Sequence, residues 1–278
     1  MQGHPIKFRP TSRQKRQTAA VALAAAVAAP YAARPFGRSR DDLDIDLGDG
    51  NRPGLVTRVL ASCLGGFADP QAAEDCVWEW ALTERLQGLL AIAIAGGCER
   101  TALQMRCRDC GTGADIDLPV SNFVTPPRRN AVVCRMPDGS EIAARLPLGS
   151  DQHAWRAAAA DPIVMATTLI ERIGHAAPRP SWRTPPDWLE PLADALADAD
   201  PLTTLQLQAA CPNCGHVNVI DFDLEGWLLA FFADEQERLI DDVHKLAAVY
   251  HWSEEAICAL PPRRRRAYLA RIKQEAGP

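Results

Sequence analysis

The sequence lacks several signals on which functional assignments commonly rest. It contains no glycine-rich phosphate-binding loop, no Gly-x-Ser-x-Gly nucleophile elbow and no His-Glu-x-x-His motif. Beyond residue 40, no segment approaches the roughly 20 apolar residues that a transmembrane helix needs. These absences favour a protein that is not an enzyme, has no small-molecule substrate and has no membrane span.

Net charge and cysteine content are also low. A formal charge of −5 over 278 residues does not indicate a general nucleic-acid binder, and 47% apolar residues is ordinary for a soluble globular protein of one or two domains. Nine cysteines are too few for a disulfide scaffold, and their number is odd. Five stand singly, and we expect them to pack in the core: Cys63, Cys76, Cys98, Cys134 and Cys258.

Positive charge gathers at the N-terminus. Residues 1–40 contain eight lysines and arginines and no acidic residue. Within them, TAAVALAAAVAA at residues 18–29 superficially resembles a secretory signal. Because the run is almost entirely alanine and too short to span a bilayer, we interpret residues 1–40 as a basic, mobile arm that carries an Ala-rich helix.

The next region, residues 41–125, is expected to be helical and to end in a cysteine motif. Residues 41–54 read as an acidic, turn-rich linker. Apolar residues at three- and four-residue steps predict one helix over roughly 71–95. Alternating runs on both sides of Cys107 and Cys110 predict two strands.

Residues 126–185 are expected to form an inserted hairpin and helix unit. A Pro-Asp-Gly turn within residues 131–147 predicts the hairpin. Ser150 and Asp151 are placed to cap a helix that continues toward Ile173. The proline-rich residues 175–188 are expected to be an exposed connector.

The last region, residues 186–278, is expected to carry a second cysteine motif and three helices. An amphipathic pattern predicts a helix over roughly 224–250, Ser253 is placed to cap a short one, and a basic helix follows Pro261-Pro262. The predicted fold class is therefore α+β: split zinc-ribbon β-hairpins with flanking amphipathic helices and a C-terminal three-helix segment.

Two distant stretches carry the same motif. MRCRDCGTGADIDLP at residues 105–119 and AACPNCGHVNVIDFDLE at residues 209–225 each contain Cys-x-x-Cys-Gly. Each motif supplies half of a tetrahedral zinc site, and a site filled by four protein ligands is structural. We therefore predict one structural Zn²⁺ bound by four cysteines: Cys107, Cys110, Cys211 and Cys214.

The separation of the motifs does not argue against a shared site. About one hundred residues lie between them, and closing such a loop costs about 1.5 kcal/mol more than closing an ordinary zinc-ribbon loop. Structural zinc contributes roughly 10–16 kcal/mol, so the ion prevails if the intervening residues fold compactly. Three alternatives stay open: a disulfide within each motif, redox-active motifs, and two metal sites completed by His216 or a lone cysteine.

Other polar clusters have structural interpretations. Asp241, Asp242 and His244 fit a solvated helix face, and His251 beside Trp252 fits a helix end. Four aspartates alternate on strands and are expected to face solvent, with a second ion site as the alternative: Asp115, Asp117, Asp221 and Asp223.

The run Arg263–Arg266 permits a nucleic-acid interpretation, because a basic helix at the end of three can imitate a helix-turn-helix. However, four successive helical residues point in four directions, and Leu269 and Ile272 need one face for packing. We therefore favour a solvated or partner-contacting helix end.

DDVHKLAAVYHWSEEAICALPPRRRRAYLARI, residues 241–272, resembles the C-terminal signature of the T-even phage baseplate hub family, the baseplate hub assembly chaperones. Upstream, ERLQGLLAIAIA, the first motif, ARLPLGSD and the second motif follow the family's order, so the resemblance covers about residues 70–275. The arm at 1–40 and the connector at Pro178–Pro186 depart from the pattern, which leaves the partner-binding surface open.

The resemblance implies a non-enzymatic structural or assembly protein of the baseplate hub in a contractile phage tail or a related injection system. It implies hub, spike or tube subunits as partners, and a location in the host cytoplasm during assembly or in the virion baseplate. The alternative classes are a zinc-ribbon nucleic-acid-binding regulator, which predicts salt-dependent DNA binding, and a redox or metalloenzyme that uses the cysteine motifs.

Overall fold

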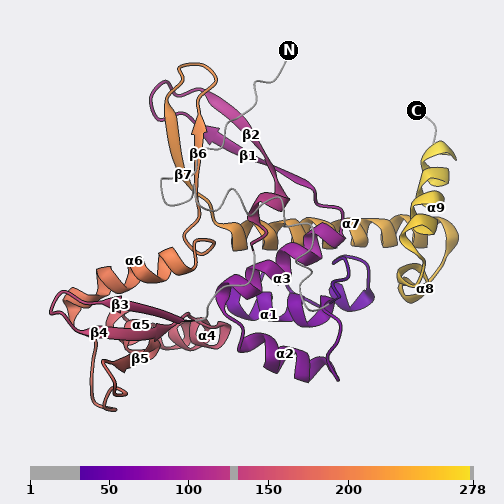
Figure 1. Ribbon diagram of the computed structural model, residues 1–278. Helices are drawn as coiled ribbons and strands as arrows, with labels where there is room; N and C mark the ends of the chain where they lie inside the picture. Colours follow the sequence, from indigo (N-terminus) through magenta and orange to yellow (C-terminus); the bar gives the residue numbers. More distant parts are fainter. Residues whose placement is uncertain (1–31, 126–130, 276–278) are drawn as a thin grey trace.

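The computed structural model describes residues 32–125 and 131–275 (Figure 1). The Ala-rich run at residues 18–29 lies outside these ranges. The helices are α1 (Arg52–Cys63), α2 (Pro70–Trp78), α3 (Leu82–Ala95), α4 (Gly149–Ala158), α5 (Pro162–Leu169), α6 (Leu189–Ala199), α7 (Leu224–Tyr250), α8 (Glu254–Cys258) and α9 (Pro262–Glu275). The strands are β1 (Arg100–Arg106), β2 (Gly113–Pro119), β3 (Ala131–Arg135), β4 (Glu141–Arg145), β5 (Ile170–Ile173), β6 (Gln206–Ala210) and β7 (Val217–Asp221).

The strands form small antiparallel sheets, which confirms the α+β class. β1 pairs with β2, and β6 pairs with β7, so each cysteine motif is the tip of a hairpin. The third sheet has the order β3-β4-β5. Its first two strands are the predicted hairpin, but residues 170–173 continue as a strand beside β4 and not as the expected helix end.

The main core joins α1, α3 and the first half of α7 to the inner faces of the β1–β2 and β6–β7 hairpins. Val56, Leu89 and Leu228 are fully buried there. The last residues of the predicted arm also belong to this core. Phe36 is 2% exposed and its ring lies 5.3 Å from that of Phe232, so residues 32–40 are packed and not free.

The inserted unit has a second core of its own. Its three-stranded sheet packs on α5 and α6 around Ile142, Trp188 and Leu192. The insert therefore folds compactly, which the prediction of a shared metal site requires. The unit reaches α6, beyond the sequence boundary at residue 185, and Trp188 is only 3% exposed, so the end of the expected connector is buried.

The helix predicted over residues 71–95 is two helices. The chain between α2 and α3 forms a β-bridge from Ala81 to Leu148, which directly precedes α4 in the inserted unit. The Leu82 amide donates to the Pro147 carbonyl at 3.2 Å, and the Ala81 amide donates to Glu84 Oε2 at 2.9 Å. A contact distant in sequence thus interrupts a run whose apolar spacing is helical throughout.

The C-terminal helices follow the prediction. α7 is 27 residues and about 40 Å long, it begins directly after the β6–β7 hairpin, and its second half extends beyond the main core. α8 and α9 pack against its far end (Figure 1). Ser253 accepts a hydrogen bond from the Ala256 amide and caps α8 as expected. Within the described residues, no helix is long and apolar enough to cross a membrane.

Candidate metal centre

Each cysteine motif folds into the same tight turn at the tip of its hairpin. In the first, the Cys107 amide donates to the Thr112 carbonyl at 2.9 Å and the Gly111 amide to the Cys107 carbonyl at 3.0 Å. The second motif repeats this pattern at Cys211, where both equivalent bonds form. Gly111 and Gly215 adopt φ of 71° and 75°, a backbone conformation that favours glycine. The sequence repeat is therefore a structural repeat.

The two turns meet, and their four sulfurs form one group. All four Sγ atoms lie within 4.8 Å of one another. Across the motifs, Cys107 Sγ lies 3.7 Å from Cys214 Sγ, and Cys110 Sγ lies 3.6 Å from Cys211 Sγ. A tetrahedral ion with bonds of about 2.3 Å to sulfur separates its ligands by about 3.8 Å. The spacing therefore fits a tetrahedral metal ion.

This arrangement bears on the alternatives. The nine cysteines are all free, so the structure contains no disulfide within either motif. Because the sulfurs of both motifs form one group, two separate metal sites are not what the fold builds, and His216 lies outside the group. The shared four-cysteine cluster is the arrangement that the sequence predicts.

A buried asparagine braces the two turns directly. Asn218, on β7, is 3% exposed, and its side chain reaches the opposite motif. Its Oδ1 accepts from the Arg108 amide at 3.0 Å, and its Nδ2 lies 3.7 Å from Cys107 Sγ. Hydrogen bonds to ligand atoms of this kind orient thiolates and tune metal affinity. The sequence analysis did not identify Asn218, because its partners lie about a hundred residues away.

The electrostatics of the cluster favour a bound cation. Hydrogen bonds from the Thr112 side chain and amide lower the pKa of Cys110 to about 5. At Cys214 an amide hydrogen bond from His216 lowers the pKa, but the neighbouring sulfurs raise it to about 12, because thiolates so close repel one another. Four thiolates therefore coexist here only when positive charge lies among them, and a divalent ion supplies it.

The remaining candidate groups of the sequence lie apart from this centre. Asp115, Asp117 and Asp221 are exposed on strands, as predicted, whereas Asp223 is exposed but follows β7 and caps α7. Asp241 and His244 lie on the solvated face of α7, whereas Asp242 is half-buried and lies 3.6 Å from Arg265. His251 ends α7 with φ of 54°. Of the single cysteines, Cys63 and Cys98 are buried and Cys76, Cys134 and Cys258 are half-buried. No second group of metal-binding side chains occurs in the described part of the chain.

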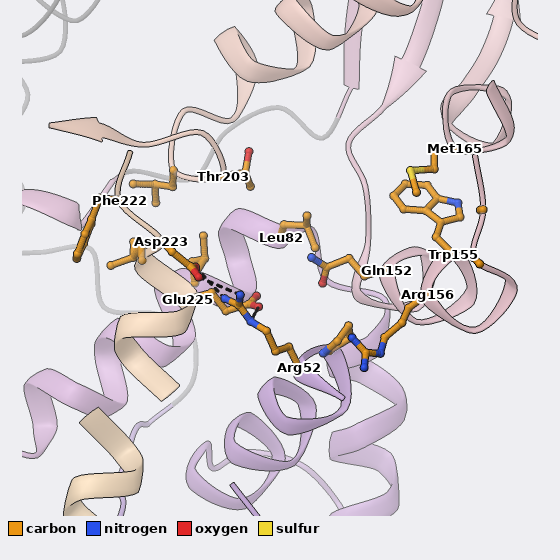
Figure 2. Close-up of a pocket in the computed structure, with 16 residues that line it drawn as sticks. Arg52, Leu82, Gln152, Trp155, Arg156, Met165, Thr203, Phe222, Asp223 and Glu225 are labelled. Atoms are coloured by element: carbon orange, nitrogen blue, oxygen red, sulfur yellow. Dashed lines mark hydrogen bonds and ion pairs between the residues drawn. The ribbon is translucent and has the colours of Figure 1, made fainter. Parts of the chain in front are cut away.

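A cleft of about 630 Å³ lies between the main core and the inserted unit (Figure 2). Trp155 and Met165 line it on the side of the insert. At its base, Arg52 donates to both carboxylate oxygens of Asp223 at 2.9 and 2.8 Å and lies 3.2 Å from Glu225. One guanidinium is thus shared by two carboxylates, and burial raises the pKa of Glu225. We interpret the cleft as the junction of the two cores.

Comparison with known proteins gives no match to this chain, whether among protein-family models, curated proteins or solved structures. The chain is thus described by what it contains: an α+β fold whose two hairpins join at a four-cysteine cluster compatible with a metal ion.

Proposed function

We propose that the four-cysteine cluster binds one structural Zn²⁺ and that the chain is a non-enzymatic structural or assembly protein of a baseplate hub. The particle would be a contractile phage tail or a related injection system, and the partners its hub, spike or tube subunits. The observation that carries the proposal is the position of the metal centre, at the tips of two hairpins of which the second leads directly into α7.

The ligand set supports a structural ion. Four cysteines provide all the ligands of a tetrahedral site, whereas catalytic zinc sites keep one position for water or substrate. Thiolates prefer zinc over hard cations such as Mg²⁺ or Ca²⁺. The ion would therefore hold chain segments together and leave no coordination site for a substrate.

The location of the cluster supports a role in presenting a surface. β7 ends at Asp221 and α7 begins at Leu224, so fixing the second hairpin against the first also fixes the direction of α7. Arg52 on α1 pairs with Asp223, the residue that caps α7, and strengthens the same joint. The long helix then carries α8 and α9, and α8 is also tied to residues 40–42 by the ion pair of Glu254 with Arg40.

The residues that resemble the baseplate family contact one another at the far end of α7. The rings of Tyr250, Trp252 and Tyr268 lie 4.8 to 5.5 Å apart, and they join the end of α7 to α9. Arg265 is 1% exposed and lies 3.6 Å from Asp242. The pattern thus coincides with the contacts that would keep the C-terminal helices in place.

Metal analysis tests the ion. The purified chain should contain one zinc per molecule, and Cys107→Ser with Cys211→Ser should contain none. The single variant Cys98→Ser is the matched control, because Cys98 is buried but lies outside the cluster. Retention of zinc by the double variant would contradict the assignment.

Gene inactivation tests the role in tails. Electron microscopy should find no complete contractile tails when the gene is inactivated in the phage or host element that encodes it. Complementation with the wild-type chain or Cys98→Ser should restore them, and complementation with the double cysteine variant should not. Complete tails at normal numbers without the gene would refute the proposed function.

A further inference from the structure

α9 presents a strongly basic surface at the far end of α7. Five of its cationic side chains are exposed, and we call them the basic strip: Arg263, Arg264, Arg266, Arg271 and Lys273. The buried side of the helix includes Arg265, and Tyr268, Leu269 and Ile272 are half-buried on the same side. The arginine run is therefore divided, because its third member packs inward and its other members face solvent.

The strip has a defined shape. At about 100° per residue, the five cations cover roughly half of the helix circumference. Ala267, Ala270 and Gln274 lie in the middle of this arc with Arg263 at its N-terminal end, Arg264 and Arg271 form one flank, and Arg266 and Lys273 form the other. The strip is thus a shallow track, with two alanines along its floor, between two rows of positive charge, and it is about 15 Å long.

The two cations at the start of α9 do not serve its stability, whereas Arg271 donates to the Ala267 carbonyl and Lys273 lies in the last turn. Arg263 and Arg264 occupy the first turn, which contains no acidic residue, although the positive end of the helix dipole favours acidic side chains there. Among the described residues, the one ion pair of α9 is the inward pair of Arg265 with Asp242. Uncompensated charge at an unfavourable helix end points to a partner outside the chain.

We propose that the basic strip is a docking site for an acidic α-helix of a partner protein. Charge complementarity and the track of alanines fit a helix about 10 Å wide, which would lie along α9 and place carboxylates against both rows. The preceding helices α7 and α8 expose acidic residues at Asp241, Glu254 and Glu255, and the chain as a whole carries a net charge of −5. They would repel the phosphates of a nucleic acid or a lipid surface, which extend beyond a single helix.

The inference rests on the proposed function only in assuming that the chain works by binding other proteins. A binding assay on the purified full-length protein tests the docking site separately. The probe is a fluorescein-labelled, alanine-based helical peptide of 21 residues with two glutamates per turn. Its neutral analogue carries glutamine at those positions. Fluorescence anisotropy at 150 mM salt should give a dissociation constant at least tenfold lower for the glutamate peptide than for the analogue.

Charge reversal locates the site. Arg263→Glu with Arg264→Glu should weaken glutamate-peptide binding at least tenfold, with an unchanged or higher melting temperature, because it also corrects the helix end. Arg266→Gln with Lys273→Gln, which removes the opposite row, should weaken binding too. The matched control, Arg172→Glu with Arg179→Glu, makes the same change in charge at exposed sites of the inserted unit and should alter binding less than twofold.

Three results would overturn the inference. The first is equal binding of the two peptides, and the second is an equal effect of the α9 and control variants. The third is that a 16-base-pair DNA duplex or phosphatidylglycerol vesicles bind more tightly than the glutamate peptide and lose this binding in the α9 variants. If tails require the gene but any of these results is found, the proposed function stands and the docking site does not.

Discussion

Cys107→Ser and Cys211→Ser should each destabilise both hairpins, although each change lies in only one of them. Cys107 and Cys211 begin the two turns, and their sulfurs belong to one cluster. The proposed shared ion would couple the hairpins, because loss of any ligand would weaken the attachment of the other three. The prediction therefore concerns which strands lose stability and not only how much the free energy of unfolding falls.

The expected size follows from the ligand count. Structural zinc contributes roughly 10–16 kcal/mol to folding, so an equal division among four thiolates gives roughly 2.5–4 kcal/mol for each. A domain is stable by only about 5–15 kcal/mol in total, so one lost ligand removes a large fraction of that free energy. Cys98→Ser, at a buried cysteine outside the cluster, should cost about 1 kcal/mol.

Hydrogen exchange measured by mass spectrometry provides the assay. In wild-type protein with zinc, backbone amides of β1, β2, β6 and β7 should exchange slowly, because they are paired in the two ladders. In either cysteine variant both hairpins should lose protection together, and EDTA treatment of the wild type should reproduce this. The second core, around the β3-β4-β5 sheet, should stay protected because it does not contain the cluster.

One result would refute the reasoning directly. If Cys107→Ser exposes only β1 and β2 while β6 and β7 keep wild-type protection, the hairpins do not depend on a common ion. Loss of protection in both hairpins in Cys98→Ser would equally show that the effect is a general consequence of core damage.

Three further predictions concern single contacts. Asn218→Ala should lower zinc affinity 10- to 100-fold in competition with a chromogenic chelator while one zinc still binds at saturation, because the ligands remain and their orienting bonds are lost; unchanged affinity would contradict this role. Although an amide bond at His216 lowers the pKa of Cys214, its sulfur neighbours raise it to about 12, so this thiol is protonated at pH 7 without metal. Zinc affinity should therefore rise with pH, and calorimetry in buffers of different ionisation enthalpy should detect a released proton. Gly149→Ala should destabilise by about 2 kcal/mol in urea unfolding, because its Cβ would overlap the buried Arg85 guanidinium, whereas Gly113→Ala, with open space around it, should cost less than about 0.5 kcal/mol.

Sequence patterns predicted the parts whose signal is local. The two cysteine motifs carry their turn geometry in four or five residues, and α7 has a clear amphipathic period. α1 was not predicted, because Leu55, Val56, Val59 and Leu60 are all buried and most of its surface packs in the core. A helix buried on most sides shows little alternation of apolar and polar residues.

Other features depend on contacts that no local pattern contains. The break between α2 and α3 is set by pairing of Ala81 with Leu148. Packing of residues 32–40 depends on Phe36 meeting Phe232, about two hundred positions later. Asn218 looks like an ordinary strand residue until the opposite turn lies against it. Each of these features depends on which distant residues come into contact, and a single sequence does not reveal such contacts.

The inserted unit explains why the two halves of the metal site can lie so far apart in the chain. It is attached to the main core at two points, at the start of α4 and at the end of α6, and both attachments adjoin the start of α3. On one side the Gly149 amide donates to the Trp80 carbonyl at 3.1 Å, and on the other the Thr83 hydroxyl hydrogen-bonds to Asp200.

Once these contacts form, the second hairpin is separated from a fixed point of the core only by residues 201–205. Closing a loop of about ten residues to Cys211 costs about 2 kcal/mol less than closing one of a hundred. The insert therefore does not act as a flexible loop of its full length. Its own core and its two anchors bring the second motif close to the first without help from an ion, so most of the binding energy of the proposed zinc would remain available to fix the direction of α7.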